Sequence, residues 1–441
     1  MGNAQTPRIR ILENTIKGEK KNMAIEHNLY WIWLAEACGA ASKSFVRLID
    51  RFSDPFEIYS LDEEQIEHIE GIGERLKARL CDKQLEGAYS VIRACKSSKI
   101  DIITYGDKRY PSRLKKLEDA PAVLFCKGKF PDFDSRLCIG IVGTRKMSEY
   151  GMRSAYKISY ELAAAGVCVV SGMASGIDGV SACGAIEGGG TTVAVFGCGI
   201  SRIYPKEHTA LARAIRSNGA VITEYPPYEE PHGYNFPKRN RIISGLCQGV
   251  IVIEGAKGSG ALITATRAIE QGRQLFALPG NINEDNSYGP NELIKSGAHV
   301  ALSAEDIIGY YDFLYHDTFD MRAYARAKKS SDFSYKAVEK YGVDAVAQTS
   351  LETKREVVKC EKKLEKAVPE QAKSVKAEPP KNLDALDPAT KRVYDALPDG
   401  AFTVDALTSC GIAVNEIMMS LTMLEINGLI ASLPGGAYKK I

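Results

Sequence analysis

Residues 167–178 read Val-Cys-Val-Val-Ser-Gly-Met-Ala-Ser-Gly-Ile-Asp, and this stretch decides the fold. Its first five residues form a mostly apolar run rich in valine, which predicts a strand that is buried on both faces. The run ends at Ser171-Gly172, where a glycine-rich turn leads into a helical pattern. A buried strand followed by such a turn and a helix is typical of a parallel sheet in an α/β domain.

The same unit recurs on both sides of this stretch. We predict strands at residues 138–143, 167–171, 192–196, 220–223, 250–254 and 275–278. Each run is nearly uniformly apolar, and helical stretches separate the runs, which predicts a mostly parallel sheet covered by helices on both faces. We therefore expect a Rossmann-like, doubly wound α/β domain over residues 99–312, with its ligand site beyond the carboxyl ends of the strands.

The chain before this domain has a helical texture. Residues 24–98 predict a small helical domain of the SAM or helix-hairpin-helix kind, because a helix end, the turn Gly71-Ile72-Gly73 and a new helix follow one another. Two interpretations of this turn stay open, a contact between its amides and a phosphate or plain packing of two helices. Residues 1–23 are basic and polar, and we expect a disordered tail.

Two further segments follow the α/β domain. We predict a solvated basic linker over residues 313–383, since residues 322–381 hold 15 Lys or Arg against 9 Asp or Glu. Over residues 384–441, three short helices and a terminal hairpin around Pro434-Gly435-Gly436 predict a winged helix. Its third helix, within residues 414–427, carries no Lys or Arg. Contact with a protein is therefore favoured over reading of DNA bases, and both stay open.

The composition excludes several classes of protein. No apolar run approaches the roughly 18 residues that a membrane span requires, and we expect no membrane partner. The N-terminal stretch lacks the apolar core of a signal peptide. The 11 cysteines form no C-x-x-C pair, which favours buried structural thiols over zinc ligands. These features predict a cytoplasmic protein, and the net charge of +2 indicates no partner by itself.

The unusual residues gather where the predicted strands end. Five consecutive crossovers carry glycines or basic groups there: Gly143-Thr144-Arg145, Ser171-Gly172, Lys206, Phe236-Pro237-Lys238-Arg239-Asn240-Arg241, and Ser259-Gly260 with Thr264. Any one glycine is explained by a tight turn. Together, however, free amides at helix N-termini, glycines and nearby cations make up phosphate sites. Their repetition along one edge favours a polyanion over a single nucleotide.

The arginines of the fourth crossover strengthen this interpretation. Arg239 and Arg241 precede the apolar helical run 242–246, and we expect both of them at the N-terminus of that helix. Cations there oppose the macrodipole by a few tenths to about 1 kcal/mol each, and a bound anion would reverse the penalty. Aromatic rings at Phe236 and Tyr204 are candidates for stacking on bases, or else core residues.

The same loops lack the motifs of an enzyme. There is no G-x-x-x-x-G-K-[ST] and no complete dinucleotide fingerprint, and the histidines show no metal-ligand spacing, so we predict no cofactor and no metal. Asp178 is expected to cap the helix that follows it, with a catalytic acid as the alternative. We find no candidate catalytic residue and expect a binding protein.

Six ordered motifs resemble the DNA-processing protein A (DprA/Smf) family. They are G-T-R at 143–145, S-G-x-A-x-G-I-D at 171–178, Y-P-K at 204–206, F-P-x-R-N-R at 236–241, S-G-x-L-I-T at 259–264 and P-G at 279–280. The resemblance implies a protein that binds and protects single-stranded DNA and loads the RecA recombinase during natural transformation, usually as a homodimer. It extends to both ends of the chain, apart from the tail and the linker.

The resemblance also implies roles for individual residues. Arg145 and Lys206 would hold phosphates, and Arg239 and Arg241 would flank the same pocket. Backbone or hydroxyl contacts would come from Gly143, Gly172, Gly260 and Thr264. Ser175 and Ala182 depart from the family, because many relatives have Arg and His there, which leaves this pocket less positive.

The alternative function is that of a nucleotide phosphoribohydrolase on a related Rossmann-like fold. Such enzymes carry P-G-G-x-G-T-x-x-E, in which the glutamate is catalytic. Here Pro279-Gly280 continues into Asn281-Ile282-Asn283 with no matching glutamate, which disfavours this alternative.

Overall fold

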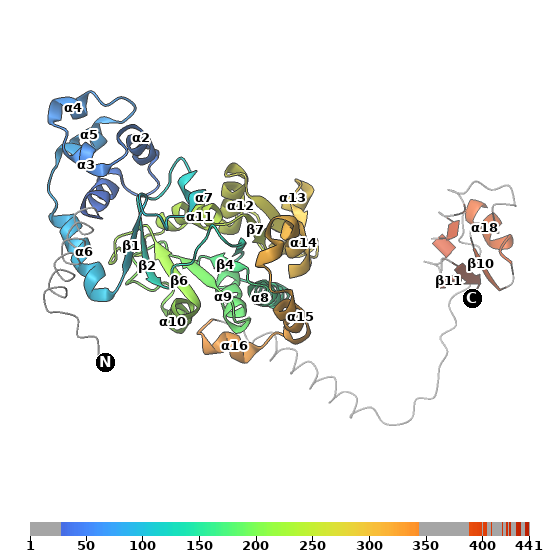
Figure 1. Ribbon diagram of the computed structural model, residues 1–441. Coiled ribbons are helices and arrows are strands. Elements are labelled where there is room, and N and C mark those ends of the chain that lie inside the picture. Colours follow the sequence, from blue (N-terminus) through green and yellow to red (C-terminus); the bar gives the residue numbers. More distant parts are fainter. Residues whose placement is uncertain are drawn as a thin grey trace, which may run out of the picture. The chain divides into compact units, whose positions relative to one another are not determined.

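The computed structural model describes residues 28–343 and parts of 388–441 (Figure 1). The chain divides into two compact units, Met1–Lys354 and Arg355–Ile441. The predicted tail, residues 1–23, and residues 344–383 of the predicted linker lie outside the described residues. No helix in the described parts of the chain is long and apolar enough to cross a membrane.

A nine-stranded sheet organises the first unit. Its strands are β1 (Asp101–Thr104), β2 (Val123–Gly128), β3 (Cys138–Val142), β4 (Cys168–Ser171), β5 (Thr192–Val195), β6 (Gly219–Thr223), β7 (Gly249–Val252), β8 (Gln274–Ala277) and β9 (His299–Val300). They lie in the order β1-β2-β6-β5-β4-β3-β7-β8-β9. The pairs β1–β2 and β2–β6 are antiparallel, and all other pairs are parallel. The six predicted strands are confirmed to within two residues, whereas β1, β2 and β9 were not predicted.

The order of the strands creates a crevice at β3 and β7. From β3 the chain builds the sheet outward through β4, β5 and β6, then returns to place β7 on the other side of β3. The crossovers on the two sides of this point leave in opposite directions, which opens a crevice beyond the carboxyl ends of the strands. The loops after β3 and β7 therefore border the expected ligand site.

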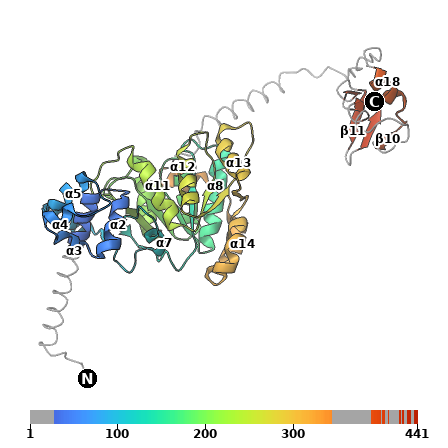
Figure 2. The same cartoon turned by 90° about the horizontal axis from the view of Figure 1, so that it is seen from above.

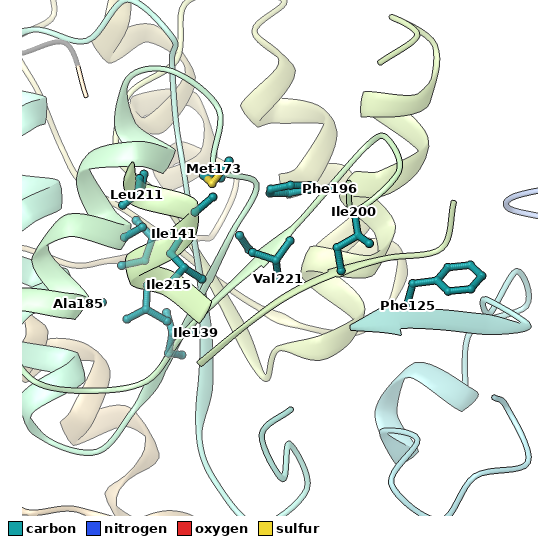
Figure 3. Close-up of a cluster of buried hydrophobic side chains, with 14 of the residues drawn as sticks. Phe125, Ile139, Ile141, Met173, Ala185, Phe196, Ile200, Leu211, Ile215 and Val221 are labelled. Atoms are coloured by element: carbon teal, nitrogen blue, oxygen red, sulfur yellow. The ribbon is translucent and has the colours of Figure 1, made fainter. Parts of the chain in front are cut away.

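Helices cover both faces of the sheet (Figure 1). One face carries α8 (Glu149–Ala164), α9 (Ile177–Glu187) and α10 (Thr209–Asn218), and the other carries α7 (Ser112–Lys115), α11 (Asn235–Leu246) and α12 (Gly260–Glu270). The strands are buried on both sides, because alternate residues belong to two separate apolar clusters. Figure 3 shows the cluster under α8–α10, where Ile139 and Ile141 of β3 lie with Leu211 and Ile215 of α10.

The ends of the sheet carry different helices (Figure 2). Beside β1 lie α2 (Lys43–Phe52), α3 (Pro55–Tyr59), α4 (Glu63–Glu67), α5 (Glu74–Cys81) and α6 (Glu86–Ser98), and at the opposite end lie α13 (Tyr288–Lys295) and α14 (Ala304–Tyr315). The expected turn between two helices is present, with Gly71 at a φ of +80° and Gly73 as the N-cap of α5. Contact between this turn and a phosphate stays a prediction.

The predicted linker is wrong over residues 313–343. The helix α14 continues to Tyr315, and then α15 (Met321–Ser330) packs on α8 and α16 (Tyr335–Lys340) packs on α9. Tyr324, Val338 and Val343 are buried, and Ser331 donates a hydrogen bond of 2.7 Å to the buried carboxylate of Glu161. The excess of Lys and Arg in this segment did not indicate this packing. The basic residues of α15 and α16 face solvent, whereas a few apolar residues at helical spacing contact the domain.

The second unit contains the predicted hairpin. Its described elements are α18 (Pro388–Asp395), β10 (Ala401–Thr403), β11 (Ile430–Leu433) and β12 (Ala437–Lys440), and the strands form an antiparallel sheet in the order β10-β12-β11. Val393, Phe402, Leu424 and Ile430 contribute to its core. The other two predicted helices lie mostly outside the described residues.

Candidate nucleic-acid interface

A cavity of about 270 Å³ lies beyond the carboxyl ends of the central strands, at the crevice that the strand order predicts. Eight predicted site residues line it: Gly143, Arg145, Phe236, Arg239, Asn240, Ser259, Gly260 and Thr264. They come from three segments that are far apart in the sequence: the loop after β3, the helix α11 and the start of α12. The structure therefore brings most of the predicted site together in one place.

The helical phase of α11 explains which of its side chains reach the cavity. Phe236, Arg239, Asn240 and Ile243 stand at positions i, i+3, i+4 and i+7, and all four line it. Arg241 is two residues beyond Arg239, about 200° around a helix with 3.6 residues per turn. The two arginines consequently point in opposite directions and cannot serve the same pocket.

The expected position of these arginines at a helix N-terminus is wrong. The helix begins at Asn235, so that both arginines lie beyond its first turn, where the macrodipole argument no longer applies. Pro237 lies in the first turn, as the third residue of the helix. Proline is tolerated in the first turn of a helix, because its missing N–H has no intrahelical partner there.

Positive charge at the cavity comes from Arg145 and from the beginning of α12. Arg145 is exposed, and its guanidinium carbon lies 6.0 Å from the centre of the Phe236 ring. The first turn of α12 faces the cavity, and Ser259 caps it by accepting a hydrogen bond from the amide of Ala261. A helix N-terminus together with an arginine favours an anion such as a phosphate.

Arg239 lines the cavity mainly as a structural cation. It is buried and donates hydrogen bonds to the carbonyl of Gly172, at 2.8 Å, and to that of Val195. The nearby Asp178 carboxylate accepts a hydrogen bond of 3.0 Å from the amide of Gly172. Burial raises the pKa of Asp178, while Arg239 and the Gly172 amide oppose this rise. Asp178 therefore anchors the loop after β4, and the helix cap expected of it is wrong, since Gly176 is the N-cap of α9.

Arg241 belongs to a buried ion pair on the other side of α11. Its guanidinium lies 2.6 Å from Glu224 Oε2 and 3.5 Å from Asp119 Oδ2, and the side chains of Arg241 and Glu224 are 2% and 4% exposed. The amide of Ala41, in the helical N-terminal region, donates to the same carboxylate at 3.4 Å. The prediction that Arg241 contacts DNA is therefore wrong, because the residue joins α11 to that region.

Six predicted site residues do not line the cavity: Thr144, Ser171, Gly172, Lys206, Lys238 and Arg241. Ser171 is buried at the end of β4, which contradicts a direct contact. A Cβ on Gly172 would lie 2.5 Å from the Arg239 guanidinium, so this glycine allows Arg239 to approach. The backbone amide of Thr144 donates a hydrogen bond to the carbonyl of Glu254, and its carbonyl accepts one from the amide of Ile177.

Lys206 and Lys238 are exposed, in the 3₁₀ helix Lys206–His208 and on α11, and their contacts with DNA stay predictions. In the described parts of the chain, no group of three or more His, Cys, Asp or Glu is arranged to hold a metal ion.

Comparison with known proteins gives the family. Residues 101–312 match the family described as DNA recombination-mediator protein A. The DNA processing protein DprA of Bacillus subtilis is 41% identical over 238 residues, which cover 53% of this chain and 80% of that protein. This chain belongs to the DprA/Smf family.

Further matches extend the similarity to DprA/Smf proteins. Residues 377–436 match the DprA winged helix domain, which confirms the predicted winged helix. The DprA of Streptococcus pneumoniae is 42% identical over 212 residues, covering 47% of this chain and 73% of that protein. The X-ray structure of DprA from that organism superposes with a TM-score of 0.56 at 33% identity, and covers 64% of this chain and 97% of that one.

Several cavity residues of this DprA/Smf chain were missed from its sequence: Ala174, Asp178, Gly233, Ile243, Ala261 and Ile263. Ile243 carried a usable signal, because it stands at i+7 from Phe236 once the helix is known to start at Asn235. The small residues carried no signal in the sequence, because the course of the backbone and not a side chain places them at the cavity.

Proposed function

We propose that this DprA/Smf chain binds single-stranded DNA without cutting it, protects the DNA and delivers it to the RecA recombinase. One observation carries the proposal: the exposed cation Arg145 lies over the Phe236 ring, beside a cavity onto which the first turn of α12 opens. A phosphate fits the arginine and the helix N-terminus, and a base fits the ring. A chain of nucleotides satisfies both at once.

The ring favours a single strand over a duplex. Tyr204 lies 5.3 Å from Phe236 and is half exposed, so two rings stand beside the phosphate site. Stacking on them requires a base whose face is free, and duplex DNA keeps its bases stacked on one another. Binding is favoured over cleavage. Among the described residues that line the cavity, Asp178 alone carries a carboxylate. That carboxylate accepts a hydrogen bond from the Gly172 amide and lies near the Arg239 guanidinium, so it has a structural role.

A salt-dependent titration tests this proposal. Arg145→Ala with Lys206→Ala should weaken binding to a labelled oligonucleotide of any sequence, measured by fluorescence anisotropy. The slope of log K against log [salt] should become shallower by about 1.4, at roughly 0.7 for each lost phosphate contact. Lys157→Ala with Arg213→Ala removes the same charge from exposed positions on α8 and α10, and should leave the slope unchanged. An unchanged titration of the first variant would exclude this surface.

The proposal has two finer parts, RecA loading and a homodimer. The family's description as a recombination mediator supports transfer of DNA to a recombinase. The protein should therefore shorten the lag of RecA ATPase activity on single-stranded DNA, and an unaltered lag would reject loading.

Exposed apolar side chains at the α14 end of the sheet support association of two copies. Leu302, Phe313 and Leu314 are exposed, Phe313 to 96%. Phe313→Glu should convert a dimer into a monomer in light scattering, whereas a wild-type monomer would reject the dimer.

A further inference from the structure

A second pair of rings lies beside the cavity, just before α11. Tyr234 is 63% exposed, and its ring is parallel to that of His232, with 5.3 Å between the centroids and 3° between the planes. The ammonium of Lys238, one turn further along, lies 5.6 Å from the centre of the Tyr234 ring. Two stacked rings and a cation are thus grouped in one short segment that faces solvent.

This pair is continuous with the candidate DNA site. Gly233, which separates the two rings in the sequence, lines the cavity, and so does Phe236, two residues after Tyr234. Two steps along the backbone span at most about 7.6 Å between Cα atoms. Tyr234 therefore stands next to Phe236 at the rim of the cavity, within reach of the neighbouring nucleotides of one strand.

The chemistry of the pair suits a base. Tyrosine and imidazole rings are surfaces on which unpaired bases stack, and a nearby lysine suits the phosphate that follows. With 63% of Tyr234 exposed, His232 and Lys238 do not cover the whole ring. Tyr228 provides a contrast on the same loop, since it is 55% exposed and has no ring or cation contact among the described residues.

We propose that Tyr234, supported by His232, is a second base-stacking platform of this protein. It stacks on a base next to the one at Phe236, and Lys238 contacts the adjoining phosphate. The proposal rests on the proposed function, because it extends the same strand of DNA beyond the cavity. It assigns to His232 and Tyr234 a role that the motifs do not include.

Abasic DNA separates stacking from every other role of Tyr234. The full-length protein is titrated by anisotropy with an oligothymidine and with an abasic strand of equal length, which keeps the phosphates and lacks the bases. Tyr234→Ala should weaken binding to oligothymidine about 10-fold and leave binding to the abasic strand unchanged. Tyr234→Phe should bind both strands like the wild type, and Tyr228→Ala is the matched control with no loss on either strand.

Each other outcome overturns part of the proposal. Equal losses on both strands would make Tyr234 a structural residue, and no loss on oligothymidine would remove it from the interface. Lys238→Ala should weaken binding to both strands, because it removes a phosphate contact; an effect on neither strand would reject that contact. If the wild type binds neither strand, the proposed function fails, and that result is distinct from any difference between variants.

Discussion

Arg241→Met tests the assignment of Arg241 to a buried ion pair instead of to DNA. The substitution keeps the length of the side chain and removes the guanidinium, which leaves the Glu224 carboxylate without its partner at 2.6 Å. Removing one partner of a buried pair costs about 3–5 kcal/mol, because the remaining charge stays desolvated. A unit of some 320 residues unfolds with an entropy of roughly 0.7 kcal/mol/K, so the midpoint of thermal unfolding should fall by roughly 4–7 °C.

The loss should depend on pH. Burial raises the pKa of Glu224, and Arg241 opposes this rise. Without Arg241 the pKa in the folded state rises further, so the folded variant retains a proton at pH values where the unfolded chain releases it. The stability of the variant therefore falls as the pH rises from the ordinary glutamate pKa through the folded pKa. The gap to the wild type should be smaller at pH 5 than at pH 8.

Thermal unfolding followed by circular dichroism measures these effects, with two controls. Arg267→Met breaks an exposed pair with Glu270 and should cost no more than about 1 kcal/mol. Arg241→Met with Glu224→Gln removes both charges and should recover most of the stability. The reasoning is refuted if Arg241→Met unfolds like the wild type and instead gives a shallower salt dependence of DNA binding.

Three further variants or measurements test other parts of the structure. Gly172→Ala should cost about 1–3 kcal/mol of stability and weaken DNA binding, because the new methyl group meets the Arg239 guanidinium. Gly309→Ala is the control, since the space around Gly309 is open. If the two variants have the same free energy of unfolding, this packing is contradicted. Val338→Ala should destabilise the protein by about 1–3 kcal/mol, whereas a change within about 0.5 kcal/mol would restore the linker interpretation of α16. Burial raises the pKa of Cys95 and Cys126 to about 12, so these two thiols should resist iodoacetamide in the native protein at pH 8 and react after unfolding. Rapid alkylation of the native protein, detected by mass spectrometry, would contradict their burial.

The strands and the location of the site were predictable because both depend on local pattern. Nearly uniformly apolar runs such as 192–196, separated by helical stretches, favour central strands of a covered sheet, and glycines after them mark the loops at its ligand edge. β1, which begins with exposed and half-buried residues, and β9, with two exposed residues, lack that pattern. Neither could be recognised without the neighbouring strand with which it pairs.

By itself the sequence determined the α/β class, the order of the loops, the family and the arginine and glycine motifs. The tertiary structure decided which cations face the ligand. The helix α11 starts at Asn235, so Arg239 and Arg241 both lie within it and point to opposite sides. Arg145 is exposed beside the cavity, Arg239 holds the loops after β4 and β5, and Arg241 is buried against Glu224. Equal charges in these motifs thus have different roles, because burial and partners depend on distant segments that only folding brings together.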